Sequence, residues 1–447
     1  MTTSWAERVG WTSYLGYHWR GQSSFPFRSR HAIEKAQSHR VKAMVEHAYS
    51  TVPYYRETMK RLNLSPSDFR MATDLAKLPI IEREQLQRDP EYFESSSSRR
   101  GRDIEVRSGG STGAPRLVKW NTAAVFQNAG HAERERSIIA GKVGRLVGYR
   151  ESVIASRFGS EQDVQAIYRD YALLPKRTSI QYQQLSLLDP PEHNVQQLNQ
   201  FRPDVIRSYG SYLGRLFEWL HSTGTPFHKP KVVFYDADEL PVTARSLITD
   251  EFGIEVLSAY QAVEAFKIGF ECDRHTGIHL NVDIYPLRFV DDAGTDVEDG
   301  SSGQIVVSNL VNSATVLLNY RLGDVARMTG AACLCGRTLP VMSYIEGRTD
   351  DWIRLISGES VHPQSVRTLF TDETSVKRYQ VIQQRLDHFS VSIESLQQDD
   401  ALEERIRNRF KERFGNVSVG VAFVDVIAPS DGGKMRPVIC AVNGGRS

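Results

Sequence analysis

The sequence predicts a two-domain α/β protein, in which a large N-terminal domain with mixed sheets flanked by helices precedes a small α+β domain. Three observations support this prediction. The 447 residues exceed the usual size of one domain. Strand-like runs alternate with helical patterns between Asp204 and Tyr260, which is typical of an α/β sheet. After the turn-like string GRTDD at Gly347–Asp351, strand patterns combine with one amphipathic helix.

The N-terminal part begins with a predicted helical layer. Between Ile33 and Leu62 apolar residues recur on roughly one helical face, and the string VPYY at Val52 predicts a turn. The run ESSSSRRGR at Glu94–Arg102 has no apolar periodicity, so we expect a mobile loop there. This loop directly precedes the most Gly-rich segment of the chain.

Two strand–loop–helix units follow. A strand starting at Val205 runs into YGSY, and a helix is predicted behind Ser211 as its N-cap. The second unit has a strand within Val232–Leu240, a helix over about Val242–Phe252 and a further strand, IEVLSAY. Units of this kind predict the α/β sheet of the large domain.

The pattern changes after Cys272 to short β-like runs broken by the turns DDAGTD and EDGSSG, which predicts a small β-rich subregion. Strands are expected in GQIVVSNL and ATVLLNYR. We place the domain boundary at GRTDD, giving domains 1–347 and 348–447. The second domain should contain the strands YQVIQQ, FSVSIE and VGVAFVDVI and the helix ALEERIRNRFKERFG.

Composition excludes several classes of protein. A net charge of +1 gives no overall field toward nucleic acid or anionic lipid, so neither partner is expected. The N-terminus lacks a basic start with an apolar core, and no stretch approaches the roughly 20 apolar residues of a membrane span. Four cysteines do not make a disulfide framework in a chain of this length. We therefore expect a soluble cytoplasmic protein.

Three polar motifs are individually weak. Ser108–Pro115 reads SGGSTGAP, which offers backbone N–H groups and hydroxyls to phosphate, but a flexible surface loop has the same composition. Tyr320–Asp324, YRLGD, is compatible with an ordinary turn, and the lysine in GGKMR at Gly432–Arg436 with a solvated loop.

A separate cluster has the donor set of a zinc site. Cys272, Cys333, Cys335 and His279 supply three thiolates and an imidazole, which suit tetrahedral Zn²⁺. Buried cysteines beside an unrelated histidine would give the same pattern. His275 competes with His279 for the fourth position, and spacing does not decide between them.

The order of the motifs is more specific than any one of them. SGGSTGAP, YQAVE at 260, YRLGD, GRTDD and GGKMRPV together resemble the adenylate-forming superfamily. PDVIRSYGSYL, the early VPYYR and CLCGRTLP…IEGRTDDWI resemble its phenylacetate–CoA ligase branch, and the resemblance extends from about residue 35 over nearly the whole chain. It implies an AMP-binding N-terminal domain and a mobile C-terminal domain that rotates about a hinge near Asp350.

The resemblance also implies roles for individual residues. Glu264 would coordinate Mg²⁺, Tyr260 would lie by the adenine and acyl pocket, and Asp324 would accept hydrogen bonds from both ribose hydroxyls. Arg348 would neighbour ribose and phosphate, and Lys434 would be the catalytic cation that stabilises charge at the α-phosphate. The β- and γ-phosphates would be held by the loop residues Ser108, Gly109, Gly110, Ser111, Thr112 and Gly113.

Two positions depart from the family pattern, because Gln261 and Val263 stand where glycine and a hydroxyl residue are common. The carboxylate pocket is expected near Tyr209, Ser211, Tyr235–Glu239 and Tyr260. Tyrosines suit an aryl or unsaturated acid but suit core packing equally.

The resemblance implies ATP-dependent conversion of a carboxylic acid to an acyl-adenylate with release of pyrophosphate. Transfer to a thiol follows, most simply coenzyme A. One alternative is transfer to an amine, and another is a non-catalytic binding protein, which the two departures favour. The implied cofactors are ATP, Mg²⁺, structural Zn²⁺ and CoA, and the resemblance also admits a homodimer.

Overall fold

The computed structural model describes residues 4–98, 103–107, 117–155, 164, 167–168, 170–173, 180–348, 352–358, 360–361, 364–370, 373, 375–395, 400–428 and 436–442. The helices and helical turns are α1 Trp5–Trp19, η1 Phe25–Phe27, α2 Arg30–Thr51, α3 Pro53–Arg61, η2 Pro66–Asp68, η3 Ala72–Lys77, α4 Arg83–Arg88, η4 Pro90–Phe93, α5 Thr122–His131, α6 Glu133–Val143, α8 Pro191–Phe201, α9 Gly210–Thr223, α10 Val242–Ser246, η5 Leu247–Glu251, α11 Gln364–Arg367, η7 Thr368–Phe370 and α12 Asp400–Phe414.

The strands form one large sheet and several small ones. The large sheet has eight strands in the order β13-β9-β8-β7-β6-β5-β3-β4. The bounds are β1 Ile104–Arg107, β2 Leu117–Trp120, β3 Arg150–Ala155, β4 Gln181–Ser186, β5 Val205–Tyr209, β6 Val232–Asp236, β7 Glu255–Ala262, β8 Ala265–Glu271, β9 Ile278–Leu280, β10 Leu287–Val290, β11 Gly303–Val307, β12 Tyr320–Ala326, β13 Val341–Met342, β14 Gly347–Arg348, β15 Ile353–Arg354, β16 Ser360–Val361, β17 Val376–Arg385, β18 His388–Ser395, β19 Ser418–Phe423 and β20 Val438–Cys440.

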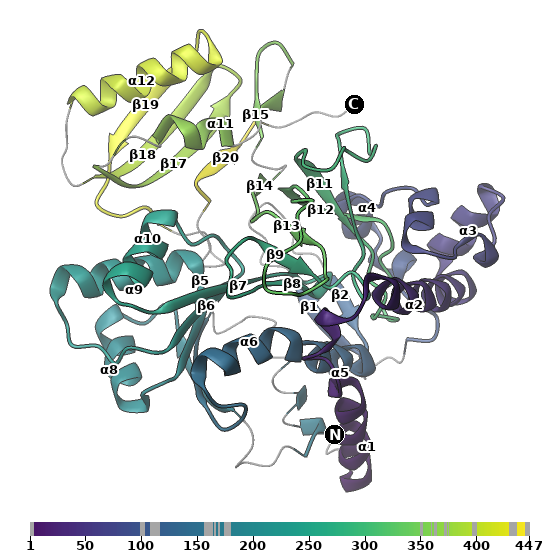
Figure 1. Cartoon of the computed structure of the whole chain (residues 1–447). Helices are drawn as coiled ribbons and strands as arrows, with labels where there is room; N and C mark the ends of the chain where they lie inside the picture. The colour runs from purple at the N-terminus through teal and green to yellow at the C-terminus, as the bar shows by residue number, and fades with distance from the viewer. Residues whose placement is uncertain are drawn as a thin grey trace.

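The large sheet is the α/β sheet that the sequence predicts. Its strands from β4 to β7 pair in parallel, and β7, β8, β9 and β13 pair antiparallel. Figure 1 shows α9 and α10 on one face and α6 on the other. Neighbouring strand residues serve opposite faces: Ile206 and Val233 pack in the α9 cluster, whereas Val205 and Val232 pack in the α6 cluster. Both faces are buried, as in parallel sheets generally.

The predicted cap of α9 is wrong in one detail. The helix begins at Gly210 with Tyr209 as N-cap, and Ser211 lies inside its first turn. The Ser211 hydroxyl and backbone N–H both donate to Asp238, at 2.5 and 3.1 Å. A serine that satisfies an acceptor on a neighbouring loop is not available as a cap. The second unit also differs, because the predicted helix changes to a π-helical turn over Leu247–Glu251.

The predicted β-rich subregion is the sheet β10-β11-β12-β14. GQIVVSNL contains β11, but the predicted strand in ATVLLNYR begins only at Tyr320. Side chains rather than a strand partner bind this backbone: the Tyr55 hydroxyl donates to Val316 O at 3.0 Å and accepts from Leu318 N–H at 2.7 Å. Asn312 Nδ2 also donates to Thr315 O. The apolar run is therefore buried without belonging to a sheet.

The C-terminal domain is the predicted α+β unit, with a sheet in the order β19-β18-β17-β20 covered by α12. Leu402, Ile406, Phe410 and Phe414 recur at helical spacing on the buried side of α12. They pack with Val381 and other strand residues in a core separate from those of the large domain. Because Phe410 is fully buried, its replacement by alanine should cost about 3–5 kcal/mol.

The two domains meet at α9 and β17. Arg378 Nη2 donates to Glu218 Oε2 at 2.6 Å across the contact, and Arg378 Nη1 lies 3.6 Å from Glu394 of its own domain. Figure 1 places the C-terminal sheet against the α9 and α10 side of the large domain. Within the described part of the chain, no helix combines the length and apolar character needed to cross a bilayer.

Candidate active site and metal centre

Three of the predicted nucleotide-binding residues meet in the structure. Tyr260 on β7 donates its hydroxyl to Asp324 Oδ2 at 2.8 Å, and Arg348 Nη1 lies 3.0 Å from Asp324 Oδ1. The β12–β14 ladder fixes the second contact, since Asp324 and Arg348 are register partners. Burial, with the Asp324 carboxylate beside it, holds the pKa of Tyr260 well above its usual range, so this hydroxyl stays a donor.

Glu264 lies in the turn between β7 and β8 and is buried. Tyr320 donates its hydroxyl to Glu264 Oε1 at 3.3 Å, and Asn309 Nδ2 donates to the Glu264 carbonyl at 2.8 Å. The sequence contained a signal for Tyr320, because it opens the YRLGD string, but pattern reasoning assigned it no role. A buried carboxylate oriented in this way is a suitable ligand for a hard cation such as Mg²⁺.

The predicted phosphate loop, Ser108–Gly113, lies outside the described residues, but the strands on either side of it are described. β1 and β2 pair antiparallel, with Arg107 opposite Leu117. At the other end of β2, Trp120 Nε1 donates to the carbonyl of Val263 at 2.9 Å. The hairpin that carries the loop therefore contacts the residue before Glu264.

Lys434 and the hinge residue Asp350 also lie outside the described residues. The tail rejoins the described part at Arg436, whose carbonyl accepts from Gln380 Nε2 at 3.1 Å. β20 then pairs parallel to β17. Of the predicted catalytic pair, only Glu264 is therefore placed.

The expected acid pocket lies at the carboxyl ends of β5, β6 and β7. Gly210 is required there, because a Cβ at this position would lie 2.4 Å from Leu240 N in the loop after β6. The two positions that depart from the family pattern have distinct contacts. Gln261 Nε2 donates to Asp236 Oδ2 at 2.6 Å, whereas Val263 packs against the apolar core.

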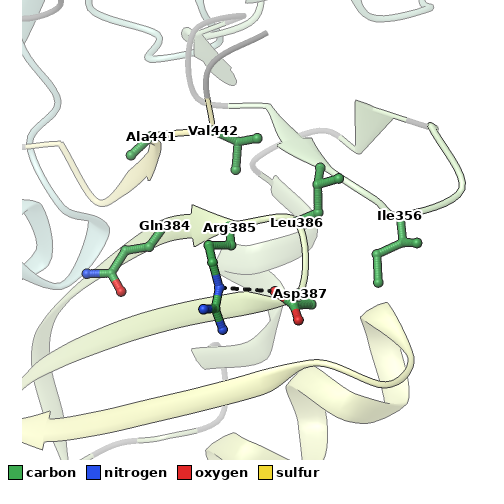
Figure 2. Close-up of a pocket in the computed structure, with 7 residues that line it drawn as sticks. All are labelled: Ile356, Gln384, Arg385, Leu386, Asp387, Ala441 and Val442. Carbon is green, nitrogen blue, oxygen red and sulfur yellow. Dashed lines mark ion pairs between the residues drawn. The ribbon is translucent and has the colours of Figure 1, made fainter.

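A hollow of about 610 Å³ on the C-terminal domain, shown in Figure 2, is separate from these residues. An Arg385–Asp387 ion pair of 3.4 Å lies in it. No predicted site residue contributes to its wall, which is formed by Ile356, Gln384, Arg385, Leu386, Asp387, Ala441 and Val442. Volume alone is therefore a poor guide to the chemistry of this protein.

The predicted metal ligands converge. One donor atom from each of Cys272, His279, Cys333 and Cys335 lies within 4.8 Å of all the others. Cys272 Sγ and Cys333 Sγ are 3.6 Å apart, and Cys335 Sγ is 3.3 Å from His279 Nε2. Thiolates bound to one tetrahedral Zn²⁺ at about 2.3 Å would be about 3.8 Å apart, so the donor set fits this ion.

His279 rather than His275 lies in this cluster. Its Nδ1 is 3.3 Å from Leu339 O, which directs Nε2 toward the cysteines. Burial lowers the pKa of His279 to about 4, so the ring is neutral, and burial raises the pKa of the Cys272 thiol to about 12. That thiol would have to lose its proton on binding a metal.

His275 is instead held by two carboxylates. Its ring nitrogens lie 3.1 Å from Glu255 and 2.8 Å from Glu271, and these contacts raise its pKa to about 9. A protonated imidazole cannot bind a metal. Pattern reasoning left the two histidines open because the deciding glutamates are close in space and only one of them is close in sequence.

Comparison with known proteins agrees with this site. The chain is 26% identical to a phenylacetate–coenzyme A ligase of Thermus thermophilus over 92% of this chain and 97% of that protein. The chain belongs to the adenylate-forming superfamily and is phenylacetate–CoA ligase-like. Residues 355–441 match the family model described as the CapK C-terminal domain, which falls within the C-terminal α+β unit.

Solved structures share the fold of this phenylacetate–CoA ligase-like chain. A 2-hydroxyisobutyryl-CoA ligase in its postadenylation state superposes with a TM-score of 0.73 at 18% identity, over 94% of this chain and 91% of that one. The same ligase in its thioesterification state, with CoA, gives a TM-score of 0.60 over the same shares of the two chains. The relative placement of domains here is thus nearer to the first state.

Proposed function

We propose that this chain activates a carboxylic acid with ATP and transfers the acyl group to a thiol, most simply that of coenzyme A. A carboxylate oxygen attacks the α-phosphorus and pyrophosphate leaves, giving an acyl-adenylate. The thiolate then attacks the acyl carbon and AMP leaves. The observation that carries the proposal is the convergence of Tyr260, Asp324 and Arg348 beside Glu264, in a chain whose curated relatives are CoA ligases.

The proposed roles follow from the chemistry of each side chain. Asp324 accepts from the ribose hydroxyls, and Arg348 adds a permanent cation near ribose and phosphate. Glu264 binds Mg²⁺, whose part is to neutralise phosphate charge. The loop Ser108–Gly113 binds the β- and γ-phosphates. Lys434 stabilises the charge that develops at the α-phosphate.

We also propose domains 1–347 and 348–447 with a hinge near Asp350, so that Lys434 serves adenylation and leaves before thiol transfer. The separate core of the C-terminal unit supports the division. For the acid, the tyrosines at 209, 235 and 260 favour an aryl or unsaturated group. The four free thiols suit a reducing compartment, and we place the reaction in the cytoplasm.

The Cys272–His279–Cys333–Cys335 cluster is proposed as a structural Zn²⁺ site. A site with four protein ligands is closed and stabilises the fold rather than catalysing. Cys272 ends the strand region after β8, and His279 is on β9, so the ion would join the loop at 333–335 to the antiparallel edge of the large sheet.

Acid-dependent pyrophosphate release tests the proposal. A panel of aryl and aliphatic acids with ATP, Mg²⁺ and CoA should identify a substrate, and Lys434→Ala should lower the rate by about 10²–10³. Lys411→Ala, at an exposed lysine of α12, is the matched control and should leave the rate unchanged. Retained activity in Lys434→Ala, or no acid-dependent release with any acid, would refute the proposal. Product masses with CoA and amines in competition identify the acceptor.

A further inference from the structure

Three polar side chains lie together at the carboxyl edge of the parallel strands. Arg207 is on β5, Asp236 ends β6 and Gln261 is on β7. Gln261 Nε2 donates to Asp236 Oδ2 at 2.6 Å, and Arg207 Nη1 lies 3.6 Å from the same oxygen. Strand alternation puts all three on the face of the sheet that α6 covers. A glutamine, a carboxylate and an arginine therefore form one connected group there.

The group continues into a buried ionic network. Arg207 lies over the Phe234 ring at 3.8 Å and pairs with Glu151 at 2.9 Å and Glu135 at 3.0 Å. Lys267 lies 3.4 Å from Glu135. The network thus contains the carboxylates Glu135, Glu151 and Asp236 against the cations Arg207 and Lys267, an excess of one negative charge. A site of this composition favours a hydrogen-bond donor.

The network borders the proposed reaction site. Gln261 directly follows Tyr260, which binds Asp324, and it precedes Glu264 by three residues. The β7–β8 register also breaks between Tyr260 and Ala262, at Gln261. Ligands of open α/β sheets bind at the carboxyl ends of the strands. An acid placed for attack on a nucleotide at Tyr260 and Glu264 would therefore have its acyl part against Gln261.

We propose that Gln261, held by Asp236, is a specificity-determining residue that selects acids with a hydroxyl or amino group on the acyl part. This inference rests on the proposed adenylation function. A glutamine amide has two N–H donors and an acceptor oxygen, and the contacts of the described residues use one N–H. A purely apolar acyl group would remove the remaining groups from water without replacing their hydrogen bonds. An aryl acid that carries such a group satisfies both proposals, whereas unsubstituted phenylacetate does not.

The experiment compares acids of similar shape that differ in the donor. The pairs are 4-hydroxyphenylacetate with phenylacetate, 2-hydroxyisobutyrate with pivalate, and 2-aminobenzoate with 2-methylbenzoate. In the unmodified enzyme, kcat/KM for pyrophosphate release should favour the donor-bearing member of the accepted pair by about tenfold or more. In Gln261→Met, which has similar length, the ratio should fall toward one. Arg207 still faces Asp236 in this variant, so the fold should be retained.

Gln196→Met, at an exposed glutamine of α8, is the matched control and should keep the original ratio. A preference of the unmodified enzyme for the apolar member overturns the inference, and so does an unchanged ratio in Gln261→Met with an unchanged melting temperature. Failure of every acid to release pyrophosphate would overturn the adenylation proposal, and this inference with it. Activity with the reverse preference would overturn this inference alone.

Discussion

Removal of the Arg378–Glu218 ion pair should change the balance between the two half-reactions. The Glu218 side chain is 33% exposed and that of Arg378 is 9% exposed. Exposed pairs contribute up to about 1 kcal/mol, and breaking a fully buried pair costs about 3–5 kcal/mol. This pair is intermediate, so about 1–2 kcal/mol is expected. That free energy corresponds to about a five- to thirtyfold change in the equilibrium between this domain arrangement and a rotated one.

Glu218→Gln is the suitable change, because Arg378 keeps Glu394 and the C-terminal domain should remain folded. Adenylation is measured by ATP–pyrophosphate exchange, and thiol transfer by single turnover of preformed acyl-adenylate with CoA. Since this structure superposes better on the postadenylation state of a relative than on its thioesterification state, the variant should slow adenylation relative to transfer. Glu192→Gln, at an exposed glutamate of α8, should leave the ratio unchanged. An unaltered ratio in Glu218→Gln would refute the reasoning.

Two further predictions concern the metal cluster and its neighbour. Cys335→Ser, or a chelator, should lower the melting temperature by more than about 5 °C if zinc joins the loop to the sheet, whereas Cys440→Ser, outside the cluster, should not; less than about half an equivalent of zinc after purification without chelator contradicts this. His275 has a folded-state pKa of about 9, above the usual 6.5 of an unfolded chain, so its stabilising contribution should be complete below pH 6.5 and disappear as pH rises through 9. Urea unfolding of His275→Asn and the unmodified chain should therefore converge by pH 10, and a constant difference from pH 6 to 10 would contradict this.

Much of the fold could be predicted because the deciding interactions are local. The alternating units around β5 and β6 and the apolar face of α12 depend on periodicities that the sequence displays. The segment before Tyr320 could not be predicted, since Tyr55 and Asn312 supply hydrogen bonds that resemble those of a strand partner. Ser211 was misread for the same reason, because its acceptor, Asp238, belongs to another loop.

The candidate site divides in a similar way. Tyr260, Asp324 and Arg348 were predicted from the order of motifs, and the structure brings them together. The contact of Gln261 with Asp236 joins two strands that are neighbours in the sheet but separated by a helix in sequence. Residue patterns report such a contact only after the strand order is known. Roles for Ser108–Gly113 and Lys434 stay predictions.

Asp324 uses both carboxylate oxygens within the protein, one toward Tyr260 and one toward Arg348. A nucleotide that binds as proposed has to share or displace these partners, so its sugar competes directly with an arginine located where the second domain begins. Departure of AMP would let that arginine return to the carboxylate. Emptying of the site and the setting of the joint between the domains would then be two aspects of one exchange of hydrogen bonds.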